Sequence, residues 1–271
     1  IWVAKILFIL SSIFSAATMY ILAKKLFGRR AGVLAAVLYT YAPYRAVDIY
    51  VRGALSESFA FIFFPLIFYA SILLSQKANH KNIFFLALSL AGLFLTHSVT
   101  TLMFLPFLLL WWGYLTFREK RWAILLHLFL ASILGFGLAA FFLLPAFFES
   151  SFIQTKYLTV GYFNFRAHFV AFSQFFSTFW GYGSSLWGRD DRLSFQIGLV
   201  HWAILILAAI LGFILRKNRK LLGLLSFLGL SFLLSIFLQH NKSAFIWEAI
   251  PLMAFIQFPL RFLGISIFIV S

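Results

Sequence analysis

The sequence predicts an all-α protein, a polytopic transmembrane helical bundle. Hydrophobic residues make up 63% of the 271 residues and charged residues only 11%, whereas soluble domains carry about 25% charged residues. Apolar runs of about 20 residues, the length that crosses a bilayer as a helix, recur along almost the whole chain. Short charged clusters separate these runs. We therefore predict a single transmembrane domain over residues 1–271 with about nine spans.

The composition also excludes several classes of function. The formal charge of +15 is compatible with a nucleic-acid partner, but the basic residues lie between apolar segments rather than along one polar face, so no nucleic acid is predicted. The chain contains no cysteine, which excludes disulfides, thiolate catalysis and cysteine metal sites. Because the chain begins at Ile1 without a methionine and stops at Ser271 inside an apolar run, we expect a fragment that is truncated at both ends.

The expected spans follow one another with short connections. They cover residues 2–23, 31–41, 56–74, 82–95, 99–115, 123–148, 197–215 and 221–238, and a ninth begins near residue 261. The second run is short for a membrane crossing, and we expect the crossing helix to include residues from the polar stretch that follows it. Residues 149–196 form a long connection that is rich in aromatic side chains.

Basic clusters predict the orientation of the chain. If every span crosses, the clusters at 24–30, 77–81, 118–121 and 216–220 all fall on one side, which the positive-inside rule makes cytoplasmic. The connection 149–196 and six of the seven acidic residues then lie on the extracytoplasmic side. Chemistry that needs a carboxylate is therefore expected outside the cell.

The stretch 39–57 places ionisable side chains between two apolar runs. Pro43 can open a helix, and Arg45, Asp48 and Arg52 then fall at i, i+3 and i+7 on one helix face. A carboxylate between two guanidiniums stays ionised, and arginines suit the binding of a phosphate or pyrophosphate headgroup. The alternative interpretation is an interfacial ion pair that anchors a helix end.

Three further ionisable residues lie at predicted membrane boundaries. His97 is at the tip of a tight connection between two helices, and Glu149 stands where a helix leaves the membrane. Each is either a functional group or a polar residue at a helix end. Arg261 follows a proline before the last span, where it either snorkels to the interface or joins Arg45 and Arg52 around a phosphate.

The connection 149–196 allows two interpretations. Aromatic rings favour the lipid interface and also stack on sugars, so residues 165–180 fit either a half-buried re-entrant helix, which we favour, or a glycan-facing lid. The pair Asp190–Asp191 is interpreted as part of a solvated turn, with a divalent cation site as the alternative. The histidines lack metal-ligand spacing, so we predict no metal ligand and no cofactor.

Several stretches together resemble one family. They are the run from Tyr39 to Arg45 that leads to Asp48, Arg52, Gly53 and Glu57, then Leu95–Thr100, Leu144–Glu149 and Gln257–Phe262. In this order, and over most of the chain, they resemble the bacterial and archaeal multi-pass proteins called 6-pyruvoyl-tetrahydropterin-synthase-related membrane proteins. Those proteins are similar to the GT-C class of membrane glycosyltransferases, which take a sugar from a polyprenyl-phosphate donor.

This resemblance implies a GT-C-like protein of the prokaryotic plasma membrane that transfers a sugar from a polyprenyl-phosphate donor to an extracytoplasmic acceptor. The catalytic acid of that class lies in the first extracytoplasmic loop, so we expect it N-terminal to this fragment. The implied substrate-binding residues are Arg45, Asp48, Arg52, Glu57 and Arg261, and the candidates for acceptor contact or proton transfer are His97 and Glu149.

Two other functions remain open. A transporter or flippase of a lipid-linked substrate would use the same charged cluster for binding without chemistry, and a non-catalytic GT-C-like membrane protein would retain only the fold. Inverted repeats and charges near the bilayer midplane are typical of transporters. The sequence shows no repeat and places its charges mostly at boundaries, which favours the enzyme.

Overall fold

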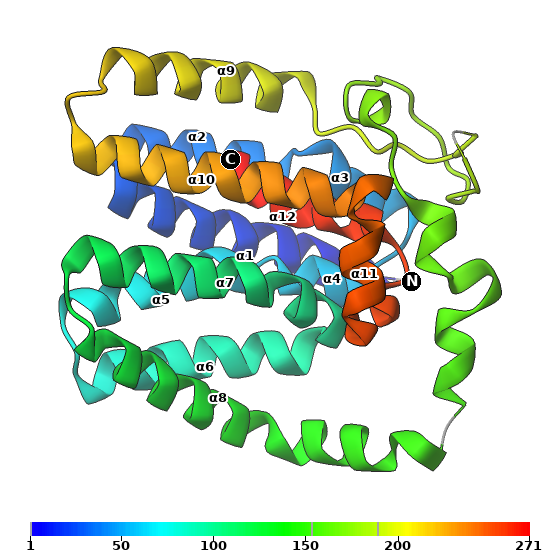
Figure 1. Cartoon of the computed structure of the whole chain (residues 1–271), viewed down its shortest axis with the longest axis horizontal. Helices are drawn as coiled ribbons and strands as arrows, with labels where there is room; N and C mark the ends of the chain where they lie inside the picture. Colours follow the sequence, from blue (N-terminus) through cyan, green and yellow to red (C-terminus); the bar gives the residue numbers. More distant parts are fainter. Residues whose placement is uncertain (1, 153, 189) are drawn as a thin grey trace. The chain divides into compact units, whose positions relative to one another are not determined.

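The computed structural model of the chain describes residues 2–152, 154–188 and 190–271 (Figure 1). None of these residues lies in a β-strand, although Tyr182 and Leu193 form an isolated antiparallel bridge. Internal contacts divide the chain into two compact units. Unit 1 consists of Ile1–Val37 and Leu55–Gln154, and unit 2 of Leu38–Ala54 and Thr155–Ser271.

Five described helical segments are long and apolar enough to cross a membrane. They are α1 (Trp2–Phe27), the segment Leu55–Gln76, α7 (Ser98–Glu119), α8 (Ala123–Phe148) and α10 (Arg219–Gln239). The apolar helices α6 (His80–Thr96) and α9 (Leu199–Ile214) and the segment Pro259–Val270 are shorter. Each predicted apolar run coincides with a helix. The prediction of an all-helical chain with apolar helices of membrane-spanning length is therefore confirmed, and the number of spans stays a prediction.

Unit 1 is held together by helix packing and aromatic stacking. It contains α1, most of α2 (Arg29–Thr40), then α4 (Leu55–Ala60), α5 (Phe63–Gln76), α6, α7 and α8. Helix α5 packs against α1, α6 and α7, and α6 packs along α8 (Figure 1). The Phe64 and Phe104 rings stack at 4.4 Å, and the Phe68 and Trp111 rings at 4.6 Å. These ring pairs fasten α5 to α7.

The α6–α8 contact depends on a glycine. A Cβ atom at Gly135 of α8 would lie 2.8 Å from the Ala87 carbonyl oxygen and 3.1 Å from Leu90 Cβ of α6. Small residues let helix backbones approach closely within a membrane, where packing rather than the hydrophobic effect drives association. Gly135 therefore sets the distance between α6 and α8.

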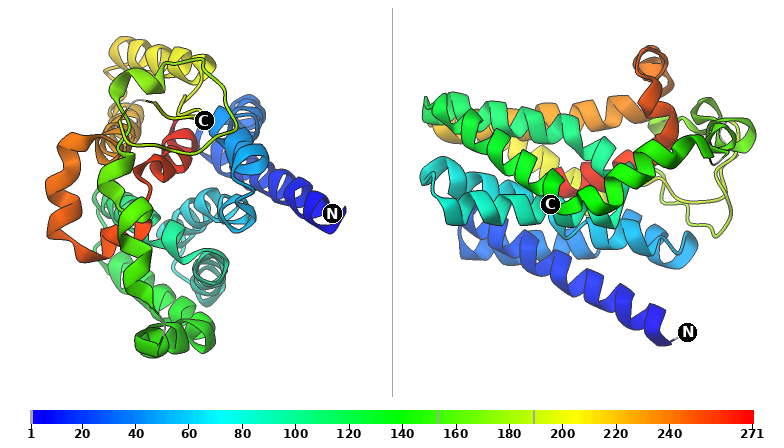
Figure 2. Two further views of the ribbon diagram at one scale, coloured as in Figure 1. Left: turned by 90° about the vertical axis from the view of Figure 1, so that its right-hand side faces the viewer. Right: turned by 90° about the horizontal axis from the view of Figure 1, so that it is seen from below.

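Unit 2 is built around α12 (Leu263–Val270), which packs against α3 (Pro43–Ala46), α9 and α10 (Figure 1 and the left view of Figure 2). The helices α10 and α12 share polar contacts, because Ser235 Oγ lies 2.9 Å from Ser266 Oγ and Gln239 Nε2 donates to Ser266 Oγ at 3.2 Å. Between α10 and α12 come short turns: η7 (Asn241–Ser243), α11 (Ala244–Ala249), η8 (Pro251–Ile256) and η9 (Pro259–Phe262).

The aromatic connection is a series of short 3₁₀ turns. After η2 (Glu149–Phe152) in unit 1 come η3 (Thr155–Thr159), η4 (Gly161–Phe163), η5 (Phe165–His168) and η6 (Phe172–Phe175) in unit 2. The prediction of a re-entrant helix over residues 165–180 is wrong. Two bonds take backbone N–H groups that a helix over these residues would use: Gln174 Oε1 accepts from Ala171 N, and Val170 N donates to the Gln239 carbonyl.

The role of Gly135 can be tested against a neighbouring glycine of the same helix. We expect Gly135→Ala to lower the thermal unfolding midpoint, because overpacking a tight contact costs about 1–3 kcal/mol. Gly137→Ala is the matched control, since a Cβ there meets nothing within 4 Å. Tryptophan fluorescence of the detergent-purified variants gives both midpoints. Equal midpoints for the two variants would show that the α6–α8 contact tolerates a methyl group.

Candidate functional site

The polar stretch after α2 folds as a helix that widens into a π-helical turn. Helix α3 begins at Pro43, whose ring presets the backbone for a first helical turn, and continues into η1 (Val47–Val51). Arg52 N bonds to the Val47 carbonyl at 2.9 Å, and Ala54 N bonds to the Asp48 carbonyl at 2.8 Å. Such turns are rare and occur frequently at functional sites. The turn sets the positions of Asp48 and Arg52.

Asp48 forms an ion pair with Arg52, one of the two arginines that the sequence places on the same helix face. Arg52 Nη1 donates to Asp48 Oδ1 and also to the Tyr44 hydroxyl, at 2.8 Å for the latter. The guanidinium lies 5.9 Å from the centre of the Tyr44 ring. The Asp48 side chain is fully buried, whereas 19% of the Arg52 side chain is exposed. A buried carboxylate therefore holds an arginine that is still accessible.

A second arginine, Arg261, follows a strained turn. Gln257 has φ 65° and ψ −51°, and Phe258 N donates to the Ile256 carbonyl at 2.7 Å, which is the geometry of a rare γ-turn. Arg261 Nη1 donates to the same Ile256 carbonyl at 2.8 Å, and Gln257 Nε2 donates to the Leu158 carbonyl at 2.8 Å. Backbone strain of this kind costs about 1–3 kcal/mol and is found preferentially at functional sites.

Arg52 and Arg261 line the same cavity, which lies within unit 2 and has a volume of about 370 Å³. Its aromatic wall consists of Tyr162 and Phe258, whose ring centres are 5.9 Å apart, and the Arg261 guanidinium lies 5.3 Å from the centre of the Phe258 ring. Among the described lining residues there is no carboxylate. The cavity thus combines two cations with an aromatic surface and has the size of a small-molecule site.

The loop Gly183–Ser185 closes another side of this cavity. Gly183 N donates to the Arg192 carbonyl at 2.8 Å, and Arg192 N donates to the Ser184 carbonyl at 3.0 Å. A Cβ atom at Gly183 would lie 2.2 Å from Arg192 Cβ, so only glycine permits this approach of the two chain segments. The turn is therefore ordered by backbone pairing and is part of the cavity wall.

Asp191 supports this loop from behind. Its Oδ1 atom accepts from Ser185 Oγ at 2.9 Å and from Leu186 N at 2.8 Å, and its Oδ2 atom accepts from Gln174 Nε2 at 2.8 Å. Both carboxylate oxygens of Asp191 thus accept hydrogen bonds from other groups of the protein. In the part of the chain that the structure describes, no group of three or more histidine or acidic side chains is arranged to hold a metal ion.

His168 is buried next to Asp191. Its Nδ1 atom lies 2.9 Å from Ser185 Oγ and its Nε2 atom 2.5 Å from the Tyr162 carbonyl oxygen. The Tyr162 hydroxyl in turn donates to the Ser185 carbonyl at 3.0 Å. Burial lowers the pKa of His168 from its ordinary value of 6.5, while the bond to the Tyr162 carbonyl and the charge of Asp191 oppose this shift.

The other predicted residues occupy different places. Arg45 is buried in α3 of unit 2, and Glu57 is buried in α4 of unit 1. His97 of unit 1 is the N-cap of α7, because its Nδ1 atom accepts from Thr100 N at 3.2 Å and lies 2.6 Å from Thr100 Oγ1. Glu149 is exposed at the C-terminal end of α8. These positions assign His97 a capping contact.

Sequence reasoning missed the residues that form the cavity wall opposite the arginines. Tyr162 is one of many aromatic residues in its segment, and His168 shows no motif. Asp191 was interpreted as part of a solvated turn together with Asp190. The closely spaced glycines at positions 181 and 183 were the available signal, since glycine pairs often mark a close approach of two backbones.

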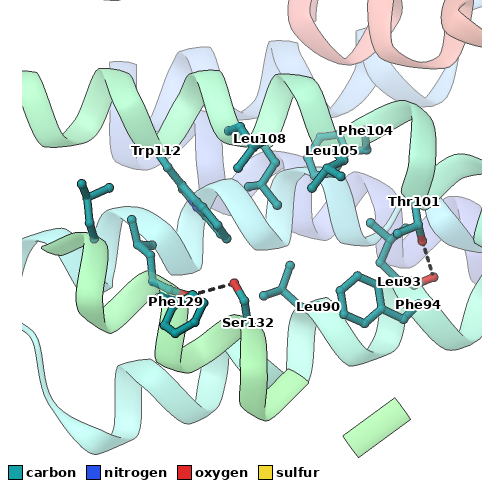
Figure 3. Close-up of a pocket in the computed structure, with 13 residues that line it drawn as sticks. Leu90, Leu93, Phe94, Thr101, Phe104, Leu105, Leu108, Trp112, Phe129 and Ser132 are labelled. Atoms are coloured by element: carbon teal, nitrogen blue, oxygen red, sulfur yellow. Dashed lines mark hydrogen bonds between the residues drawn. The ribbon is translucent and has the colours of Figure 1, made fainter. Parts of the chain in front are cut away.

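A second cavity of about 360 Å³ lies within unit 1 between α6, α7 and α8 (Figure 3). Leucine and aromatic side chains form most of its lining. Its two hydroxyl groups are engaged by backbone carbonyls, because Thr101 Oγ1 of α7 donates to the Leu93 carbonyl of α6 and Ser132 Oγ donates to the Leu128 carbonyl within α8 (Figure 3). This cavity is therefore an apolar space within the helical scaffold.

Comparison with known proteins gives one relative and no assignment of activity. A protein of Lactococcus lactis subsp. cremoris (strain MG1363), described as uncharacterized, is 32% identical over 118 residues. The aligned part is 42% of this chain and 19% of that protein, so the chain spans about a fifth of the relative's length. No family model and no solved structure matches the chain.

The capping contact of His97 leads to a prediction about stability. We expect His97→Ala to lower the unfolding midpoint of the purified protein, because loss of an N-cap costs about 1 kcal/mol. His97→Asn is expected to retain the midpoint, since asparagine is a strong N-cap. Tryptophan fluorescence during heating measures both. If His97→Asn falls as far as His97→Ala, the cap is not what His97 contributes.

Proposed function

We propose that this chain belongs to an integral-membrane glycosyltransferase of GT-C type. It would take a sugar from a polyprenyl-phosphate donor and transfer it to an acceptor on the extracytoplasmic side of a prokaryotic plasma membrane. The observation that carries the proposal is the cavity of unit 2, where Arg52 and Arg261 come together from distant parts of the sequence.

The two arginines supply the chemistry that a phosphate group needs. Guanidinium groups bind phosphate oxygens through charge-assisted, often bidentate hydrogen bonds. When the sugar leaves, negative charge develops on the lipid phosphate, and fixed cations stabilise it most where water is excluded. In this proposal Arg52 and Arg261 contact the phosphate, and Asp48 keeps Arg52 in place through the buried ion pair.

The aromatic wall supplies a surface for the sugar. Tyr162 and Phe258 lie beside each other, and Phe258 also contacts the Arg261 guanidinium. Aromatic side chains offer a large apolar face with a polar handle on tyrosine, which matches a sugar ring with one apolar side. A phosphate at the arginines would place the attached sugar next to these two rings.

The proposal assigns the catalytic carboxylate to a segment outside the residues described. The described lining of the cavity holds no aspartate or glutamate, and the resemblance to GT-C enzymes implies an acid in an earlier extracytoplasmic loop. Arg45 and Glu57 remain predicted members of the substrate-binding set, and His97 and Glu149 remain predicted contacts of the acceptor.

The same proposal includes the topology. We propose that all nine predicted segments cross the membrane, with the basic clusters in the cytoplasm. Helix α6 has 17 residues, which is at the lower limit of about 17–25 residues for a membrane-spanning helix. The connection with Tyr162 and the turn before Arg261 would then face the extracytoplasmic side, where lipid-linked sugars are used.

One observation favours a second candidate function. Because the described cavity lining has cations and no carboxylate, the same site would serve a transporter or a non-catalytic protein that binds a lipid-linked phosphate without chemistry. Binding and transfer must therefore be measured separately.

We expect Arg261→Gln to weaken binding of radiolabelled polyprenyl-phosphate sugars by about tenfold or more, because a hydrogen bond to a charged group contributes about 1.5–3 kcal/mol. Arg52→Lys keeps the charge beside Asp48 and should weaken binding less, since lysine cannot bind bidentately. Arg166→Gln is the matched control, because Arg166 is an exposed arginine of the same unit that pairs with Glu248.

Each result has a clear meaning. Binding lost in Arg261→Gln and kept in Arg166→Gln supports a phosphate site in this cavity. Sugar transfer by the native protein, lost in the same variant, supports the glycosyltransferase. Tight binding of the donor without transfer to any acceptor would favour the transporter or the non-catalytic protein. Unchanged binding in Arg261→Gln would remove the phosphate site.

A further inference from the structure

The network behind the cavity contains a buried histidine with partners at both ring nitrogens. His168 is 2% exposed, its Nε2 atom lies 2.5 Å from the Tyr162 carbonyl oxygen, and its Nδ1 atom lies 2.9 Å from Ser185 Oγ. A carbonyl oxygen only accepts, so Nε2 carries a proton in either charge state of the ring. The charge state of His168 is therefore decided at Nδ1. This atom accepts a hydrogen bond from Ser185 Oγ or is unpaired when the ring is neutral, and it donates to Ser185 Oγ when the ring is protonated.

Ser185 has one hydroxyl proton and two neighbours that can accept it. It donates to Asp191 Oδ1 at 2.9 Å, and in that arrangement its oxygen is open to a donor from His168. A neutral imidazole with its proton on Nε2 has only an acceptor at Nδ1, so Ser185 can serve either His168 or Asp191. When the ring is protonated, His168 Nδ1 donates to Ser185 Oγ and Ser185 Oγ donates to Asp191 Oδ1. Both hydrogen bonds then form at the same time.

This chain of bonds reaches the cavity directly. Ser185 and Tyr162 both line it, and the Phe258 ring, which also lines it, packs against the imidazole at 4.5 Å. Arg261 lies over the same phenyl ring. An anion bound beside Arg261 would add negative charge next to His168 and favour the protonated ring.

Charged groups around His168 come from four segments. Asp191 acts through Ser185, and Arg261 lies across the Phe258 ring. Arg166 on the same turn is paired with Glu248 at 2.9 Å, and Arg192 runs beside Gly183 of the cavity wall. Of these groups, Asp191 is the one linked to His168 through a hydrogen-bond chain, so it is the counter-charge for a protonated ring.

We infer that His168 is a positioning residue that takes up a proton from solvent when a phosphate group binds in the cavity, and that the protonated ring holds Ser185 and the loop Gly183–Ser185 in place. No covalent bond changes, and the ligand is a phosphate mono- or diester. The inference rests on the phosphate-binding part of the proposed function and adds a proton linkage to it.

The direction of the pH dependence follows from the two states of the cavity. Burial holds the pKa of His168 below its ordinary value of 6.5 in the free protein, and a bound anion raises that pKa. At a pH between the pKa of His168 in the free protein and its pKa in the complex, the complex holds more protons than the free protein. Affinity for the anion therefore rises as the pH falls through this window, by up to about tenfold per pH unit, and is constant outside it.

Isothermal titration calorimetry with citronellyl phosphoglucose tests the inference on the detergent-purified chain. This short-chain phosphodiester keeps one negative charge between about pH 5 and pH 8, where histidine titrates, so any proton that is taken up belongs to the protein. Titrations near pH 6 in buffers of different ionisation enthalpy give the number of protons bound. We expect uptake of up to one proton in the wild type.

Two variants and a control test whether His168 is the group that takes up the proton. His168→Gln keeps a donor and an acceptor without a charge, and its binding of the probe should show neither proton uptake nor pH dependence. Asp191→Asn removes the counter-charge and should move the uptake to lower pH. His80→Gln changes an exposed histidine in unit 1 and should leave the uptake unchanged.

The outcomes separate this inference from the function on which it rests. Probe binding with no proton uptake in the wild type, or the same uptake in His168→Gln, would overturn the role of His168 and leave the phosphate site intact. No binding of the probe to the wild type at any pH would remove both. Uptake that is lost in His168→Gln and retained in His80→Gln would establish the linkage.

Discussion

The buried ion pair between Asp48 and Arg52 is the constraint on which the candidate site depends. A fully buried carboxylate is tolerated only with a charged partner and hydrogen bonds, because desolvation of an unpaired charge costs several kcal/mol. The π-helical turn η1 brings the two side chains together, and the Tyr44 hydroxyl gives the guanidinium a second fixed contact. The accessible part of Arg52 therefore lines the cavity in a fixed position.

The two units differ in the interactions that hold them together. Unit 1 relies on stacked aromatic rings, on a glycine contact between α6 and α8, and on capped helix ends such as that at His97. Unit 2 has polar contacts between α10 and α12, a strained γ-turn at Gln257, and the buried chain from His168 to Asp191. Strain and buried polar groups are costly and concentrate where a protein acts, which is why the function is sought in unit 2.

A phosphate site with an adjacent buried histidine has a physical consequence beyond binding. The arginines carry a permanent charge, whereas His168 can gain or lose a proton, and burial lowers its pKa. In our inference, protonation of His168 adds a donor to Ser185 in a loop, Gly183–Ser185, that backbone pairing with Arg192 already orders. The added hydrogen bond would couple occupancy of the cavity by an anion to the protonation of His168.

The sequence by itself determined the helical class, the positions of the long apolar helices and the nearness of Asp48 to Arg52. Apolar runs in a bilayer must satisfy their backbone groups internally, and the partners in η1 are close neighbours in the chain, so local rules suffice. Only the tertiary structure decided that Arg261 shares a cavity with Arg52, that the aromatic connection forms short turns rather than a helix, and that Ser185 lies between His168 and Asp191. These features depend on hydrogen bonds and packing between segments far apart in the sequence, which no local pattern of residues specifies.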